Sequence, residues 1–456
     1  MDDSLLGRAA AVIGAAAARM PAGRITGVSA AGLVAGGLSR LSRLGARAEI
    51  LCEAGPLRAE VIRIDGPGVL LLPEGTGEGV GLGDPVRLVP PPRFAPADDW
   101  IGRVIDPDGC PLDGRPLLPG LVPRRLRRPP PAPEGRRALG ARLATGYAVL
   151  DTLLPLVRGQ RIGLFAGSGV GKSMLLAGLA TGVEADVIVI GLVGERGREL
   201  RHFIDDVLGP DGMRRAVVVA ATSDRAPQIR ARAAHAATAV AEHFRDAGRN
   251  VLLLLDSVTR FAEAHREIAA AGGEPANLRG FPASTGPAIA ALCERAGPGG
   301  AGQGDITAVY SVLVAGSDME EPVADMLRGV LDGHVVLDRA IAEGGRFPAI
   351  DVLRSVSRAL PAAAGRVENQ LIAEARAHLG AWDRAALMIR AGLYAAGSDP
   401  QTDAAIAVQP ALEEFLALRT ATGTDAAFVA LRKALASARH GTQAVPEGAG
   451  RATPGG

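Results

Sequence analysis

The sequence predicts an α/β protein with a central parallel sheet, preceded by a small β-barrel and followed by a helical domain. Three observations support this fold class. Continuous apolar runs alternate with helical stretches from about residue 140 to 362, which is typical of parallel strands covered by helices on both faces. Shorter β-like runs, separated by Gly and Pro, fill residues 22–98. Beyond about residue 365 the apolar residues recur at helical spacing.

Composition excludes several classes of partner and compartment. The 456 residues suffice for about three domains. A net charge of +1 and an aromatic content of 3% provide neither a basic field nor stacking surfaces for nucleic acid. The cysteines, Cys52, Cys110 and Cys293, are dispersed and odd in number, which fits a reducing cytoplasm rather than a disulfide framework or a metal site. We therefore expect a cytoplasmic protein that binds no nucleic acid.

Residues 1–21 are predicted to form an amphipathic helix, with apolar side chains such as Leu5, Leu6, Val12 and Ile13 near one face. This stretch is too short and too weakly apolar to span a bilayer, and it follows acidic residues rather than the basic start of a signal peptide. A helix separated from any core either docks on a partner or a membrane surface, or is a frayed extension. Both interpretations stay open.

Shifts in composition predict the other domain boundaries. A β-barrel over 22–98 ends at a Pro-rich stretch, and a turn-rich connector and linker cover 99–139. The linker contains the basic run Arg124–Arg128, which we interpret as solvated rather than as a contact for nucleic acid or lipid. The rest of the chain divides into an α/β domain, a helical domain and a disordered tail, at residues 140–364, 365–440 and 441–456.

The strongest chemical signal is Ala-Gly-Ser-Gly-Val-Gly-Lys-Ser at 166–173. It follows a strand-like run and opens a helix-like run, so that successive backbone N–H groups and a helix N-terminus face one phosphate, as in a P-loop. The strict pattern begins with Gly, and Ala166 fits if it still lies at the strand end. Lys172 would reach the β- and γ-phosphates, and the Ser173 hydroxyl would bind Mg²⁺. The expected nucleotide contacts are Gly167, Ser168, Gly169, Val170, Gly171, Lys172, Ser173 and Met174.

Lysine usage supports this interpretation. Of the 50 Lys and Arg residues, only Lys172 and Lys433 are Lys. A chain that uses Arg almost everywhere, yet keeps Lys in the glycine-rich loop, indicates a site that needs a compact ammonium rather than a planar guanidinium. The same bias means that an isolated Arg carries little information.

Two carboxylates follow other strands of the predicted sheet. Asp256 ends a run of leucines, and a carboxylate there holds Mg²⁺ directly or through water in the Walker-B arrangement. Glu195 comes just after the run that ends at Leu192. It can orient a water for in-line attack on a γ-phosphate, although a surface charge cluster explains it equally well. Ligands of parallel sheets bind at the carboxyl ends of the strands, where both carboxylates and the P-loop fall.

Several longer segments resemble the catalytic subunits of the rotary ATP synthase superfamily. They are Gly-Glu-Arg-Gly-Arg-Glu at 194–199, Leu-Asp-Ser-Val-Thr-Arg-Phe at 255–261, Leu-Asp-Gly-His at 331–334 and Pro-Ala-Ile-Asp-Val-Leu-Arg-Ser-Val-Ser-Arg at 348–358. Within that superfamily, the chain looks most like the flagellar protein-export ATPase and its type III secretion relatives. The segments that carry this closer resemblance are 260–268, 279–282 and 397–400. The resemblance covers about residues 22–418. It implies a β-barrel, a RecA-like P-loop nucleotide domain and a helical C-terminal domain, assembled as a hexameric ring.

The resemblance also implies roles for particular residues. Glu195 would be the water-orienting catalytic carboxylate, Arg196 a nearby polar partner, and Phe347 an aromatic against the adenine ring. Arg358 falls at the arginine finger, which enters the site of a neighbouring subunit and typically raises the rate about 10³-fold or more. Because one chain carries both Glu195 and Arg358, every interface of a homohexamer could hold a complete active site.

One segment departs from the family pattern. Residues 283–292 read Ala-Ser-Thr-Gly-Pro-Ala-Ile-Ala-Ala-Leu, where the export ATPases usually carry a more apolar Pro-Pro-Ser/Thr-Val-Phe-Ala-Glu-Leu stretch. We expect this loop near the subunit interface or the pore. Its altered chemistry would then concern coupling to substrate rather than nucleotide binding.

The sequence therefore predicts a Mg²⁺-dependent ATPase that energises type III export of flagellar proteins. The implied partners are an export apparatus, chaperones, unfolded flagellar substrates and a stator-like regulatory protein at the N-terminal helix, with peripheral association at the inner-membrane export gate. A virulence secretion ATPase is the nearest alternative. A Rho-like RNA translocase would want more aromatic and basic residues than the barrel has. A non-catalytic nucleotide-binding scaffold would have no use for Glu195.

Overall fold

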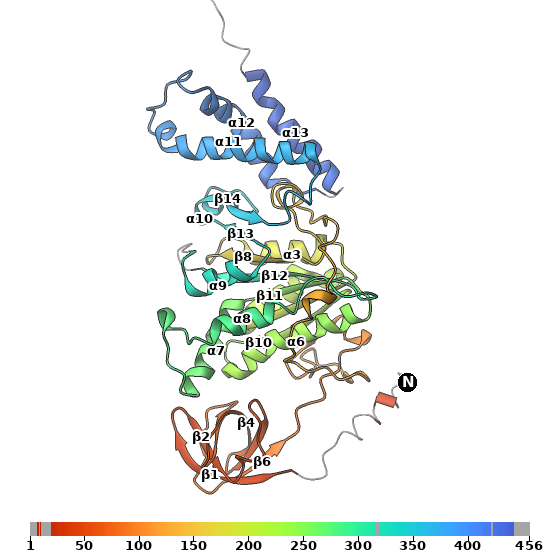
Figure 1. The fold of residues 1–456 in the computed structure, drawn as a ribbon, viewed down its shortest axis with the longest axis vertical. Helices are drawn as coiled ribbons and strands as arrows, with labels where there is room; N and C mark the ends of the chain where they lie inside the picture. The colour runs from red at the N-terminus through yellow and green to blue at the C-terminus, as the bar shows by residue number, and fades with distance from the viewer. Residues whose placement is uncertain (1–6, 9, 11–19, 315–318, 421–422, 442–456) are drawn as a thin grey trace, which may run out of the picture.

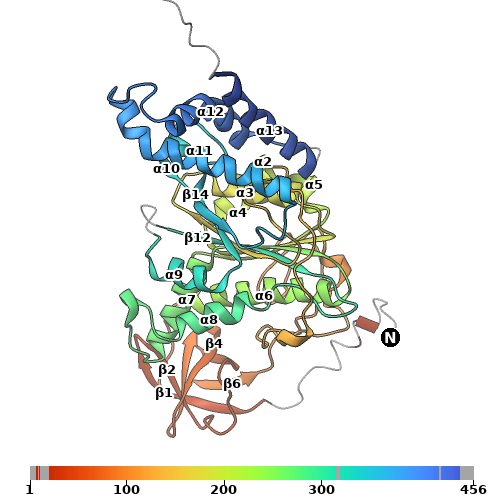
Figure 2. The same cartoon turned by 45° about the horizontal axis from the view of Figure 1, so that its top comes forward.

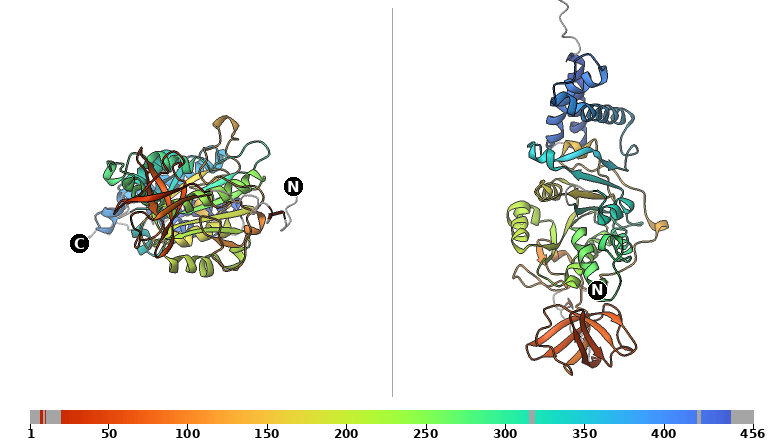
Figure 3. Two further views of the ribbon diagram at one scale, coloured as in Figure 1. Left: turned by 90° about the horizontal axis from the view of Figure 1, so that it is seen from below. Right: turned by 90° about the vertical axis from the view of Figure 1, so that its left-hand side faces the viewer.

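The computed structural model describes residues 7, 8, 10, 20–314, 319–420 and 423–441. Three parts are stacked along the long axis of the molecule in the order of the sequence (Figure 1, Figure 3). A β-barrel lies at one end, an α/β domain in the middle and a helical domain at the other end. The predicted helix over 1–21 and the predicted tail over 441–456 fall almost entirely outside the described residues.

The N-terminal part is a closed antiparallel barrel with the strand order β1-β2-β5-β4-β3-β6. Its strands are β1 (Ala22–Ser29), β2 (Gly32–Gly36), β3 (Arg47–Cys52), β4 (Gly55–Ile64), β5 (Val69–Pro73) and β6 (Pro85–Val89). Alternate side chains of each strand point inward. Ile25, Leu33, Ile50, Val61 and Leu71 are buried and fill the interior. This barrel confirms the predicted β-domain.

Within the described residues, a central sheet of 8 strands has the order β14-β13-β8-β12-β11-β9-β10-β7. These strands are β7 (Arg103–Ile105), β8 (Arg161–Ala166), β9 (Val187–Glu195), β10 (Ala216–Thr222), β11 (Val251–Asp256), β12 (Ile306–Leu313), β13 (Gly333–Leu337) and β14 (Ile350–Ser357). Neighbours are parallel except β13 and β14, which pair antiparallel. The predicted parallel sheet is therefore confirmed.

Helices cover both faces of this sheet (Figure 2). The helices of the middle domain are α2 (Ala148–Asp151), α3 (Lys172–Gly182), α4 (Gly197–His202), α5 (Gly209–Met213), α6 (Pro227–Asp246), α7 (Val258–Ala271), α8 (Thr285–Cys293), α9 (Pro322–Val330) and α10 (Arg339–Glu343). Short 3₁₀ turns are η1 (Asp98–Trp100), η2 (Pro133–Gly135) and η4 (Leu278–Gly280), and η3 (Phe203–Leu208) is π-helical. α6, α7 and α8 lie on the barrel side, and α3 lies on the side of the helical domain (Figure 1).

The two covered faces explain why the strands are continuously apolar. In β9, Ile188 and Ile190 belong to the core that includes α3, whereas Val187 and Val189 belong to the core beneath α6. Small residues let α6 approach the sheet closely. A methyl group on Gly191 of β9 would lie only 2.8 Å from the Ala237 Cβ.

The helical domain consists of α11 (Arg366–Arg390), α12 (Pro400–Ala417) and α13 (Thr424–Gly441). Its apolar side chains, including Leu379, Leu412, Phe415 and Phe428, join the core on the α3 face of the sheet. α12 and α13 also contact α2, which connects this domain to the sheet. Among the described helices, none combines the length and the apolar character needed to cross a membrane.

The connector differs from its predicted form in two places. Residues Arg103–Ile105 form β7 and add an edge strand to the central sheet beside β10, where we predicted only turns. A strand this short shows too little alternation to be recognised in a sequence. The basic run is only partly solvated. Arg125, Arg127 and Arg128 are exposed as predicted, but Arg124 lies 2.6 Å from the Asp246 carboxylate of α6, and Arg128 lies 3.7 Å from the same group.

The segment 283–292, whose sequence departs from the family pattern, is also not a loop. Most of it forms α8, whose Ile289 and Leu292 are buried in the core beneath the sheet. Its Ala-rich composition suits a helix better than the loop that we expected. Its place near a subunit interface stays a prediction.

A buried ionic cluster joins the barrel to the middle domain. Arg232 of α6 donates to Glu60 of β4 at 2.7 Å and to Glu74, just after β5, at 3.0 Å. It also lies 3.4 Å from Asp108 of the connector, and Arg47 of β3 donates to that carboxylate at 2.7 Å. Burial raises the pKa of Asp108, but the hydrogen bond from Arg47 and the charge of Arg232 outweigh it, so that the pKa lies below its ordinary value. The five side chains are at most 11% exposed.

We predict that Arg232→Ala destabilises the protein by about 3–5 kcal/mol, because removing one partner leaves buried carboxylates without full compensation. The unfolding midpoint in urea or on heating measures this effect. A matched control is Arg87→Ala, which removes an exposed ion pair with Glu49 on the barrel surface and should cost at most about 1 kcal/mol. Equal shifts for the two variants would contradict a structural role for the cluster.

Candidate active site

The predicted phosphate loop has the strand–loop–helix geometry that it requires. β8 ends at Ala166, and α3 begins at Lys172. Ala166 is a buried strand residue, so the departure from Gly at this position is accommodated. Gly169 and Gly171 have φ angles of 77° and 86°, in the left-handed region that Gly adopts without strain. The backbone can therefore turn tightly enough to aim its N–H groups at one anion.

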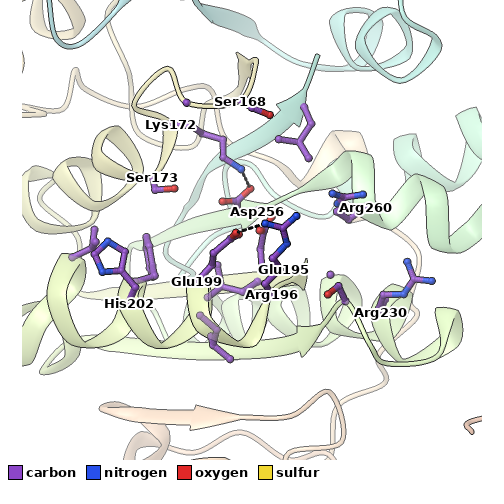
Figure 4. Close-up of a pocket in the computed structure, with 18 of the residues that line it drawn as sticks. Ser168, Lys172, Ser173, Glu195, Arg196, Glu199, His202, Arg230, Asp256 and Arg260 are labelled. Atoms are coloured by element: carbon purple, nitrogen blue, oxygen red, sulfur yellow. Dashed lines mark hydrogen bonds and ion pairs between the residues drawn. The ribbon is translucent and has the colours of Figure 1, made fainter. Parts of the chain in front are cut away.

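The order of the sheet brings the predicted acidic residues to this loop. β8, β12, β11 and β9 are parallel neighbours, so their carboxyl ends meet at one edge. Lys172 Nζ forms an ion pair with Asp256 Oδ1, as Figure 4 shows. Ser311 of β12 donates its Oγ–H to the same oxygen at 2.5 Å. Asp256 is thus fixed from two sides at the mouth of the loop.

Glu195 is the last residue of β9, three positions beyond the strand end that we predicted at Leu192. Ser223 N donates to its backbone carbonyl at 3.0 Å, which ties the end of β9 to the end of β10. Burial and the Asp256 carboxylate raise the pKa of Glu195 to about 7; Lys172 opposes this rise and Glu199 adds to it. A carboxyl group with a pKa near neutrality is suited to exchange a proton with water.

These side chains line an open cavity of about 800 Å³. Polar lining residues that we did not predict are Glu199, His202, Ser223, Arg230, Arg260, Glu263 and Glu267. Arg260 lies in the first turn of α7, within the segment 255–261 whose resemblance drew attention to Asp256 alone. Arg230 has no such signal, because in a chain with so many Arg residues no spacing distinguishes it.

Each arginine that lines the cavity is paired with a carboxylate of its own chain. The distances are 2.6 Å from Arg230 to Glu267 and 2.8 Å from Arg260 to Glu263. Arg196, the predicted polar partner, has a side chain that is 76% exposed and lies 3.4 Å from Glu199. The positive charge of each of the three guanidinium groups is therefore balanced by a neighbouring carboxylate.

Two predicted nucleotide contacts are exposed side chains close to the phosphate loop, and Phe347 is not among the described residues that line the cavity. Met174 lines the cavity from the first turn of α3 and is 68% exposed. Phe347 is 46% exposed, and a methyl group on Gly171 would lie 3.2 Å from its ring. The aromatic ring is therefore adjacent to the phosphate loop, although it is distant in sequence.

Arg358 is not among the described residues that line the cavity. It follows β14, the edge strand that β13 separates from β8. Its guanidinium donates to the Arg328 carbonyl at 3.3 Å. Within one chain, the structure therefore brings together the P-loop, Asp256 and Glu195 but leaves Arg358 outside.

The site fits Mg²⁺ through oxygen donors. Ser173 offers a hydroxyl and Asp256 a carboxylate, and both are the hard ligands that Mg²⁺ prefers. In the part of the chain that the structure describes, no group of three or more His, Cys, Asp or Glu could hold a metal ion. The donor set therefore suits an ion that also takes ligands from nucleotide phosphates.

A P-loop and two strand-end carboxylates at one edge of a parallel sheet define the class of P-loop nucleotide hydrolases. Residues 146–357 match the family model "ATP synthase alpha/beta family, nucleotide-binding domain", and residues 366–433 match the "T3SS EscN ATPase C-terminal domain". The flagellum-specific ATP synthase of Caulobacter vibrioides is 46% identical over 414 residues, which cover 89% of this chain and 93% of that protein.

Solved structures of a secretion ATPase are similar over nearly the whole chain. The assembled ATPase EscN of the enteropathogenic E. coli type III secretion system has a TM-score of 0.83 and 37% identity, covering 91% of this chain and 100% of that one. EscN in complex with its central stalk EscO has a TM-score of 0.79, with 37% identity and the same coverage of 91% and 100%. The chain therefore belongs to the family of flagellum-specific ATP synthases and type III secretion ATPases, and it is an ATPase. This confirms the predicted family and fold.

We predict that ATP hydrolysis falls as the pH drops through about 7, because the Glu195 carboxylate becomes protonated there. Glu199→Gln removes a neighbour that raises this pKa, so the acid limb of the kcat/KM profile should move to lower pH. ATP itself titrates identically in the assays of all the enzymes, so its titration does not affect the difference between their profiles. Glu343→Gln, which changes only an exposed ion pair with Arg339, should keep the wild-type profile. Identical profiles for all three enzymes would contradict the role of Glu195.

Proposed function

We propose that this ATPase uses Mg²⁺ and ATP to energise type III export of flagellar proteins across the inner membrane. The proposed ATP hydrolysis rests on one observation: Lys172, Asp256 and Glu195 converge at the P-loop cavity. Lys172 would bind the β- and γ-phosphates, and Ser173 and Asp256 would hold Mg²⁺, which would supply charge neutralisation at the transferred phosphoryl group. Glu195 orients a water for in-line attack and accepts its proton.

We further propose that Arg358 completes the site of a neighbouring subunit. In the described chain its guanidinium contacts a backbone carbonyl and has no carboxylate within ion-pair distance. An uncompensated cation on the surface is available to a developing negative charge elsewhere, unlike the paired Arg196, Arg230 and Arg260. The proposed assembly is a homohexamer, in line with the assembled state of the related EscN.

The remaining partners follow from the family. EscN binds a central stalk, EscO, so a stalk protein is a proposed partner of this chain as well. We also propose a regulatory, stator-like protein at the N-terminal helix, an export gate at the inner membrane, chaperones and unfolded flagellar substrates. The location is then cytoplasmic and peripheral to the membrane. Phe347 and Met174 would border the adenine and the ribose-phosphate, and residues 167–173 the phosphates.

A virulence secretion ATPase is the second candidate, because EscN belongs to such a system. Identity separates the two only slightly: the flagellum-specific ATP synthase of Caulobacter vibrioides is 46% identical and the type 3 secretion system ATPase of Pseudomonas syringae 44%, and we favour the flagellar function because the first seven of eight such relatives are flagellum-specific. Restoration of motility in a flagellar mutant that lacks its own export ATPase distinguishes the two. A non-catalytic scaffold would bind ATP tightly without releasing phosphate.

The shared site predicts complementation between two inactive variants. Glu195→Gln and Arg358→Ala should each lower phosphate release about 10³-fold or more. Mixed in equal amounts, they should regain up to about one quarter of the wild-type rate, because one interface in four then pairs an intact Glu195 with an intact Arg358. Phosphate release at a protein concentration that allows assembly measures this recovery.

The control for this experiment is Arg339→Ala, which removes an exposed arginine that pairs with Glu343 on α10. Alone it should keep full activity. If subunits are seen to exchange, yet the mixture of Glu195→Gln and Arg358→Ala stays inactive, Arg358 does not serve a neighbour. If the wild-type chain binds ATP and releases no phosphate, the scaffold replaces the proposed function.

A further inference from the structure

Ser311 is a buried hydroxyl in a strand that is otherwise built for the core. β12 reads Ile-Thr-Ala-Val-Tyr-Ser-Val-Leu, and the Ser311 side chain is fully buried in it. Burying a hydroxyl costs free energy unless a hydrogen bond compensates for it. Here the bond goes to Asp256 Oδ1 at 2.5 Å, across two neighbouring strands. A small apolar residue would fill the same space without that cost, so the hydroxyl is tied to the carboxylate.

Two donors share one oxygen of Asp256. Lys172 Nζ and Ser311 Oγ both bind Oδ1, although the two donors differ in what else they face. Lys172 lines the cavity at the phosphate loop, whereas Ser311 lies inside the sheet and does not line it. When nucleotide phosphates attract the ammonium, Ser311 remains as the donor that keeps Oδ1 turned into the sheet.

We propose that Ser311 is a positioning residue that fixes the rotamer of Asp256, so that the other carboxylate oxygen, Oδ2, faces the cavity and its Mg²⁺. The inference rests on the proposed function, because it assigns Asp256 to the metal. It extends that function by naming the group that holds the carboxylate once Lys172 is engaged with phosphate. A carboxylate that is free to rotate binds a hard cation less well, since the cation must then also order it.

The test uses the full chain and titrates Mg²⁺ at a fixed concentration of fluorescently labelled ADP. Ser311→Ala should raise the Mg²⁺ concentration at half-saturation about tenfold, as expected for losing a hydrogen bond to a charged group. Binding of labelled ADP in EDTA should stay within about twofold of wild type, because the P-loop is unchanged. Ser311→Thr keeps the hydroxyl and should restore most of the Mg²⁺ affinity.

Thr307→Ala is the matched control. Thr307 lies on the same strand, is also buried, and accepts from Gly159 N at 2.9 Å. Thr307 lies four positions before Ser311, so both side chains point to the same face of the sheet, about 13 Å apart along the strand. The Thr307→Ala variant loses a buried hydroxyl of the same kind, but this hydroxyl does not contact Asp256. The Mg²⁺ concentration at half-saturation should therefore stay at the wild-type value.

A half-saturation point for Ser311→Ala within about twofold of wild type overturns the inference. So does an equal shift in Thr307→Ala, which would mean that any loss of a hydroxyl from this strand has the same effect. The ADP titration needs no hydrolysis. If the wild-type chain released no phosphate while Ser311→Ala alone shifted the titration, the proposed ATPase function would fail and the assignment of Ser311 would stand.

Discussion

The parallel pairing of four neighbouring strands is the constraint on which the active site depends. The register aligns Leu313 of β12 with Ala166 of β8, and Asp256 of β11 with Leu192 of β9. Backbone hydrogen bonds therefore fix the strand ends relative to one another before any side chain is placed. Lys172 and Asp256 are 84 residues apart in the sequence and still form an ion pair, because Asp256 ends β11 and Lys172 follows the loop that leaves the end of β8. Only rotamers remain to be set, and short contacts such as that from Ser311 can set them.

The ammonium group of Lys172 lies near two carboxylates, Asp256 and Glu195, and the environments of these two groups differ. Lys172 forms an ion pair with Asp256 directly. Glu195 is desolvated and faces the Asp256 carboxylate, and the charge of Lys172 does not offset these two effects, so the pKa of Glu195 rises to about 7. A carboxyl group whose pKa is raised toward neutrality by its surroundings is typical of acid–base chemistry. The proposed roles of the two carboxylates, metal ligand for Asp256 and proton acceptor for Glu195, thus follow from their positions.

The residues that the sequence predicts well are those with a local signal. The phosphate loop, Asp256 and Glu195 each follow an apolar run, so their place at a strand end is visible without knowing the fold. Arg230 and Ser311 have no such signal, because their roles depend on neighbours that are distant in the chain. The same reason hid β7, whose three residues form a strand only because β10 lies beside them. The Arg-rich composition adds a second difficulty, since no spacing distinguishes the buried Arg232 from the many arginines on the surface.

A cation from outside the chain would be useful even though three arginines already line the cavity. Arg196, Arg230 and Arg260 are each paired with a carboxylate, so each must give up a partner before it can bind phosphate. A permanently free cation inside the cavity would bind ATP before reaction as strongly as during it, and such uniform binding does not raise kcat. In the proposed assembly, an arginine supplied by the neighbouring subunit would act only where two subunits meet at the nucleotide. Pairing the inner arginines and leaving Arg358 without a carboxylate partner in the described chain would then reserve charge stabilisation for the step that needs it.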